Sequence, residues 1–272
     1  MFETLRKFAA TATSCMIALA AMTADAGATP ALWTGSGTAA GVGVSASALF
    51  TISGNTLTIV LQNTSASHAA AVQDVPGSTL TGLFFDLTGS PTLTPVSSLI
   101  AAGSIVQGGT CTGTCGASTT NVGGEFGYQA TSFPNGADRG IASSGYLTTG
   151  LSGNIGNFNN GAAGTDLDNP ASLDGINFGI ISAAAGFNPN GGLSGDPLIR
   201  DAVTFTLTGA LGLTEDDISH VSFQYGTSLT ETNIVGFDPP PPPGIGAPEP
   251  ASLTLFGLGM AGLAIVRRRR AG

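Results

Sequence analysis

Residues 203–208 read VTFTLT, in which apolar side chains alternate with threonines. Successive side chains of a β-strand point to opposite faces of the sheet, so this pattern predicts a strand with one buried and one solvated face. Residues 221–225, VSFQY, repeat the alternation. The runs 56–61 and 80–87 are more continuously apolar, which is typical of strands in the middle of a sheet, and 175–181 has a weaker strand pattern.

The composition also favours strands over helices. The chain has 41 glycines and only 9% charged residues, whereas its 42% hydrophobic content argues against disorder. One short capped turn is expected where Thr214 precedes Glu215, Asp216 and Asp217. We therefore predict an all-β fold for residues 27–238, a β-sandwich of jelly-roll-like or, as the second choice, immunoglobulin-like topology. Long loops rich in glycine and asparagine are expected, chiefly over 154–197.

The C-terminal end has three parts in a fixed order. Five prolines at 239–243 open a linker over 239–247, and Pro248, Glu249 and Pro250 follow. The apolar run 251–266 would make a helix of roughly 24 Å, which spans a ~30 Å hydrocarbon core only marginally. Four arginines, Arg267, Arg268, Arg269 and Arg270, would hold the end in the cytoplasm. Residues 248–272 are thus expected to form a membrane-anchored tail.

This tail resembles the PEP-CTERM sorting signal of exosortase substrates in Gram-negative bacteria. The resemblance implies that an exosortase removes the helix near Pro248–Pro250 and that the chain then passes to the cell surface. Under this interpretation the membrane anchor is transient. A permanent single-span anchor is the alternative.

The N-terminal 26 residues have the pattern of a secretory signal peptide. Arg6 and Lys7 precede the apolar stretch 8–22, and Ala24 and Ala26 form an A-x-A cleavage site before Gly27. We expect the secretion translocon and signal peptidase to act here, so that the mature chain begins at Gly27.

Between Gly27 and Asp238 the charge is strongly negative. Only Arg139 and Arg200 are basic there, against fourteen aspartates and glutamates, which leaves a net charge of about −12. Such a surface repels nucleic acid and anionic lipid but is compatible with cations and neutral sugars.

Cys111 and Cys115 are the cysteines that remain after signal removal. An exported location is oxidising, so a local disulfide is expected. Two free thiols are the first alternative. Metal or redox chemistry is the second, although the spacing is not C-x-x-C and further soft ligands are not evident.

Asp166, Asp168 and Asp174 are candidate calcium ligands because calcium prefers several oxygens on a flexible loop. Their spacing departs from an EF-hand, and solvated loop acids are the alternative. No other cofactor is expected. His68 and His220 are interpreted as ordinary surface or strand-edge residues, and no serine sits in a G-x-S-x-G elbow, so the chain is not expected to be an enzyme.

Aromatic side chains raise one further alternative. Trp33, Tyr128, Tyr146 and Tyr225 either belong to the core or form a platform on which sugars stack. Aromatic residues at strand positions favour the core interpretation.

A second resemblance rests on residues 123–128, 140–145 and 223–229. These segments look like motifs of exosortase-dependent surface proteins whose bodies have no assigned activity. The match implies an extracytoplasmic surface role without assigning a binding or catalytic residue. We therefore expect a non-enzymatic surface or matrix protein of the exopolysaccharide or biofilm layer. The second hypothesis is a calcium-assisted, lectin-like module that binds carbohydrate, and the third is a secreted hydrolase.

Overall fold

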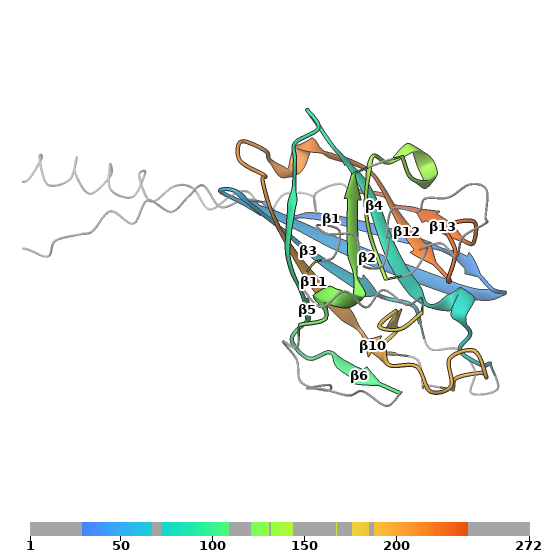
Figure 1. The fold of residues 1–272 in the computed structure, drawn as a ribbon. Helices are drawn as coiled ribbons and strands as arrows, with labels where there is room; N and C mark the ends of the chain where they lie inside the picture. Colours follow the sequence, from blue (N-terminus) through green and yellow to red (C-terminus); the bar gives the residue numbers. More distant parts are fainter. Residues whose placement is uncertain are drawn as a thin grey trace, which may run out of the picture.

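The protein is built from two β-sheets that lie face to face (Figure 1). The computed structural model describes residues 29–66, 72–108, 121–130, 132–143, 167, 176–184 and 188–238. The secondary structure of these residues is thirteen strands and four three-residue 3-10 turns. The predicted all-β class is confirmed.

The first sheet is antiparallel throughout. Its five strands lie in the order β1 (Ala31–Ala39), β2 (Val42–Ser53), β3 (Thr56–Asn63), β11 (Ala202–Thr208) and β5 (Thr94–Ile100). The strands expected at 56–61 and 203–208 are therefore confirmed, and β3 is the central one. In β11 the alternation works as predicted, because Val203, Phe205 and Leu207 are buried and the threonines between them are only half-buried.

The second sheet is larger and mixed. Its main path is β13 (Asn233–Val235), β12 (Ile218–Tyr225), β4 (Leu80–Leu87), β9 (Ile180–Ile181), β10 (Leu198–Arg200) and β6 (Ile105–Gln107). The short hairpin of β7 (Gly127–Ala130) and β8 (Arg139–Ala142) also joins β4 through β8. The strands expected at 80–87 and 221–225 are confirmed in β4 and β12.

Strand β4 is buried on both faces, which explains its continuous apolar sequence. Phe85 faces the first sheet and meets Phe50 of β2 edge to face. Phe84 faces the other way and stacks on Phe133, with ring centroids 4.7 Å apart. Phe133 belongs to the connection between β7 and β8, so this connection covers the outer face of β4.

The strand expected over 175–181 is mostly wrong. Residues 176–179 form a turn in which Phe178 has a φ of 57°, and only Ile180 and Ile181 pair, with Leu80 of β4 and with β10. A left-handed residue cannot continue a strand, so the turn shortens the element to two residues. The rest of 154–197 that the structure describes is irregular but not wholly exposed, because Leu167 and Leu193 are buried.

The chain passes from one sheet to the other at Asp201, between β10 and β11. This residue has a φ of 98°, and its carboxylate accepts a hydrogen bond from the Gln62 amide at 2.7 Å. Its carbonyl accepts the Asn63 N–H at 3.0 Å. These two bonds tie the corner to β3, next to the point where β11 begins to pair with that strand.

The turn expected at Thr214 is present as a 3-10 turn, Glu215–Asp217. The Asp217 carboxylate accepts the Thr214 N–H at 2.8 Å, which is half of a capping box. In the described part of the chain, no helix has the length and apolar character needed to cross a membrane.

Candidate functional site

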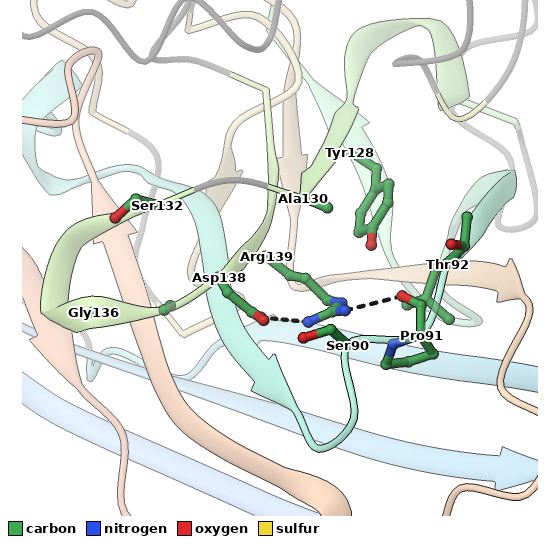
Figure 2. A pocket seen from close by; sticks show the side chains of 11 residues that line it. Ser90, Pro91, Thr92, Tyr128, Ala130, Ser132, Gly136, Asp138 and Arg139 are labelled. Carbon is green, nitrogen blue, oxygen red and sulfur yellow. Dashed lines mark hydrogen bonds and ion pairs between the residues drawn. The ribbon is translucent and has the colours of Figure 1, made fainter.

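A pocket of about 480 Å³ opens between the β4–β5 connection and the β7–β8 hairpin (Figure 2). Exposed hydroxyl-bearing residues lie at its rim, namely Ser90, Thr92 and Ser132. Tyr128 and Arg139 form its inner wall. The pocket is therefore polar at the mouth and at the base, which distinguishes it from an ordinary gap between apolar strands.

Arg139 is the buried charge of this site. Only 3% of its side chain is exposed, and the guanidinium binds the Asp138 carboxylate and the Pro91 carbonyl, the latter at 2.9 Å. Figure 2 shows the side chain reaching from the hairpin to the β4–β5 connection. A buried cation is tolerated only when it is paired in this way, so these contacts fix the hairpin against the connection. The sequence marked Arg139 only as one of two basic residues of the exported region.

Carboxylates extend the network to the surface. Asp86 of β4 accepts the Asp138 N–H and also binds His220 Nδ1. The His220 side chain is 63% exposed and its residue has a φ of 48°. His220 lies inside β12 rather than just before it, where the pairing with β4 shifts register, and it does not line the pocket. The expectation that His220 is a surface residue is confirmed.

Two polar atoms of the inner wall have no hydrogen-bond partner in the part of the chain that the structure describes. They are the Tyr128 hydroxyl and Arg139 Nε. Burial raises the pKa of Tyr128 above its usual value, and the neighbouring Arg139 guanidinium offsets part of that rise. The tyrosine is therefore a neutral hydroxyl at physiological pH, able to donate one hydrogen bond and to accept others.

The four aromatic residues considered for a sugar-stacking platform do not share one surface. Tyr225 is fully buried in the core, Tyr128 is 6% exposed, and Trp33 is half-buried on β1. The core interpretation is confirmed for Tyr225, and Tyr146 lies outside the described residues.

Most of the other predicted site residues also lie outside the described residues. They are Ala24, Ala26, Gly27, Cys111, Cys115, Asp166, Asp168, Asp174, Pro248, Glu249, Pro250, Arg267, Arg268, Arg269 and Arg270, together with the helix expected at 251–266. Leu167, between two of the candidate calcium ligands, is described and is buried. Its N–H donates to the Gly123 and Phe126 carbonyls, both at 3.0 Å. Within the described ranges, no group of three metal-ligating side chains is present.

The three motifs of the second resemblance come together in the second sheet. Tyr128 of β7 pairs with Ile141 of β8, Ile141 pairs with Leu83 of β4, and Leu83 pairs with Phe223 of β12. Segments about 80 residues apart in sequence thus become near neighbours, on either side of β4.

Comparison with known protein families identifies a motif in one segment of the chain. Residues 247–270 match the model of the PEP-CTERM protein-sorting motif. The chain carries a PEP-CTERM sorting motif. This match confirms the PEP-CTERM resemblance of the tail, and the matched range includes Pro248–Pro250, the apolar run and the arginines.

The PEP-CTERM motif indicates export, a C-terminal membrane anchor before processing, and the cell surface afterwards, with an exosortase as the processing partner. It covers 24 residues and says nothing about the two-sheet body. No curated protein and no solved structure matches this chain. The function of the body therefore has to be argued from its own residues.

Proposed function

We propose that this protein is a component of the bacterial cell surface or of the exopolysaccharide matrix, delivered there by exosortase processing of its tail. The observation that carries the proposal is the PEP-CTERM motif at 247–270, after a run of prolines at 239–243. A polyproline segment is extended and semi-rigid, so it would keep the body clear of the membrane while the tail is cut. The export signal expected at residues 1–26 is consistent with this route.

The body, which we interpret as a β-sandwich, would act by binding rather than by catalysis. Its charge of about −12 over 27–238 suits a hydrated matrix and disfavours nucleic acid as a partner. Support for a non-catalytic role comes from the position of His220, whose exposed ring lies outside the lining of the pocket. Turnover of a polysaccharide that disappears on His220→Ala would contradict this part of the proposal.

The sorting step is tested by intact mass spectrometry of protein from the surface and medium fractions of the host. We expect a species that begins at Gly27 and ends near Pro248. Replacing Pro248, Glu249 and Pro250 by alanine should abolish it and leave a longer, membrane-bound form. Replacing Pro240, Pro241 and Pro242 by alanine is the matched control, which changes three nearby residues outside the motif and should still be processed.

A full-length tail in the inner membrane of the unmodified strain would contradict the surface assignment. The protein would then be a permanently anchored, periplasm-facing protein. Equal processing of both triple-alanine variants would show that cleavage does not depend on Pro248–Pro250.

A further inference from the structure

The pocket at Arg139 has the size and the lining of a small-ligand site. Its volume of about 480 Å³ lies within the usual range of about 300–1,000 Å³ for such sites. The Ser90, Thr92 and Ser132 hydroxyls line its exposed rim, and the Asp138 side chain is 44% exposed at its side. Polar groups thus reach the mouth from both the β4–β5 connection and the β7–β8 hairpin.

The base of the pocket contains two buried polar groups that are available for hydrogen bonding. In the described part of the chain neither the Tyr128 hydroxyl nor Arg139 Nε has a partner at hydrogen-bonding geometry, although both side chains are more than nine-tenths buried. The Arg139 guanidinium lies close enough to the hydroxyl to interact with it, but without a well-formed bond. A buried donor without a hydrogen bond costs more free energy than a typical hydrogen bond contributes to stability. Both atoms lie just beneath the lining of the pocket, so a molecule seated there bonds to them through a small shift of the Tyr128 or Arg139 side chain.

The chemistry of the lining selects the kind of molecule. Arg139 Nε only donates, the free carboxylate lone pairs of Asp138 only accept, and the tyrosine, serine and threonine hydroxyls do both. A ligand rich in alcohol hydroxyls satisfies all of these groups, since each of its hydroxyls also donates and accepts. An anionic ligand is disfavoured because Asp138 already neutralises Arg139 and Asp86 adds a second negative charge beside it.

We propose that the pocket between the β4–β5 connection and the β7–β8 hairpin binds a neutral sugar unit without a metal ion, with Tyr128 and Arg139 at its base and Ser90 and Ser132 at its rim. The inference rests on the proposed surface location for the source of the sugar, a neutral polysaccharide of the matrix. It differs from the calcium-assisted hypothesis in both the residues and the ion required.

The test uses the full-length protein in a non-ionic detergent that carries no sugar headgroup, so that the result does not depend on tail processing. Saturation-transfer NMR and calorimetric titration would be run with methyl glycosides of glucose, galactose, mannose and N-acetylglucosamine, with excess chelator present. Methyl glucuronide serves as the anionic comparison. We expect at least one neutral glycoside to bind and to bind more tightly than the glucuronide.

Two variants locate the site. Tyr128→Phe removes only the buried hydroxyl and should weaken sugar binding about five- to tenfold. The double variant Ser90→Ala and Ser132→Ala changes exposed residues of the rim and should also weaken sugar binding. Tyr225→Phe is the matched control, because the buried Tyr225 hydroxyl also has no partner at hydrogen-bonding geometry among the described residues but lies away from the pocket lining. It should leave binding unchanged.

Three results would overturn the proposal. They are no binding of any neutral glycoside, tighter binding of the glucuronide, or binding that survives both the Tyr128 and the double serine change. Processing of the tail is measured separately by mass, so a failed sugar titration leaves the surface assignment intact and a failed mass experiment leaves the pocket intact.

Discussion

The Phe50 ring of β2 meets the Phe85 ring of β4 edge to face, with ring centroids 5.4 Å apart and an interplanar angle of 67°. One ring comes from each sheet and both are fully buried, so this contact joins the two layers. Edge-to-face pairs are favourable beyond the area that they bury.

Truncating either ring should therefore loosen the whole body. We expect Phe85→Ala to lower the free energy of unfolding by about 3–5 kcal/mol, through lost apolar burial and the cavity left behind. Urea unfolding of the full-length protein, followed by the fluorescence of the single tryptophan, Trp33, measures the change. Leu211→Ala is the control, because that side chain is 78% exposed and its loss should cost less than about 0.5 kcal/mol.

Glu215, in the acidic 3-10 turn, makes a long-range hydrogen bond to strand β2. Its carboxylate accepts the Ile52 N–H at 2.7 Å, two residues beyond the point where β1 stops pairing with β2. Glu215→Ala leaves this amide unpaired and should cost about 1–3 kcal/mol of unfolding free energy, whereas Glu215→Gln keeps an acceptor and should cost less. Asp216→Ala, at the exposed neighbour, should be nearly neutral. Equal losses for Glu215→Ala and Asp216→Ala would mean that the hydrogen bond adds nothing.

Removing Asp138 and removing Arg139 should lower the free energy of unfolding by different amounts. Removing the carboxylate with Asp138→Ala leaves a buried guanidinium whose remaining hydrogen bond, among the described residues, is to the Pro91 carbonyl, and we expect the free energy of unfolding to fall by about 2–4 kcal/mol. Arg139→Met keeps most of the buried stem and leaves a half-exposed carboxylate that water can solvate, so about 1–2 kcal/mol is expected. The double change should be milder than Asp138→Ala alone. A larger loss of stability in Arg139→Met than in Asp138→Ala would contradict this expectation.

Alkaline pH should destabilise the body through Tyr128 and Tyr225. Burial raises the pKa of both tyrosines, with the Arg139 guanidinium opposing the rise at Tyr128 and a Ser65 contact opposing it at Tyr225. Below pH about 10 both tyrosines keep their hydroxyl proton in the folded and in the unfolded chain, so their ionisation does not lower the free energy of unfolding. Above that pH the tyrosines of the unfolded chain ionise first, and the free energy of unfolding falls until the pH passes the pKa of the folded state. The slope due to Tyr225 should approach about 1.4 kcal/mol per pH unit, and Tyr128 should add to the decline in the same direction.

Urea unfolding from pH 8 to pH 11 checks this dependence, because Tyr225→Phe and Tyr128→Phe should each flatten the decline. Substitution of an exposed residue, as in Leu211→Ala, should leave the slope unchanged. A decline of the same steepness in both tyrosine variants would place its origin elsewhere.

Local sequence was sufficient for features that depend on neighbouring residues. Period-two alternation located β11 and β12, the apolar run 80–87 located β4, and Thr214 before three acids located the 3-10 turn. The sorting motif was equally accessible, because its parts lie within 24 consecutive residues. These signals work from sequence alone since each arises from backbone periodicity, capping or order along the chain.

Some strands were missed although a signal existed. β2 buries Val44, Ala46, Ala48, Phe50 and Ile52 at every second position, but small alanines and serines make that alternation weak. β9 keeps only two residues of the strand expected over 175–181, and β10, which was not predicted, has three; these strands exist because β4 and β6 supply partners. The sequence of so short a strand carries too little information to define it.

The pocket was decided by tertiary structure alone. Arg139 is one of two basic residues in a long acidic region, and nothing adjacent to it in sequence predicts that Pro91, 48 residues away, supplies its carbonyl partner. Gly140 beside it is required because a Cβ there would lie 2.6 Å from Phe84, a residue of another strand. The sequence by itself determined the all-β class and the sorting tail, since both follow from patterns along the chain. The site required the fold, because its donors and acceptors come from segments that only sheet pairing brings together.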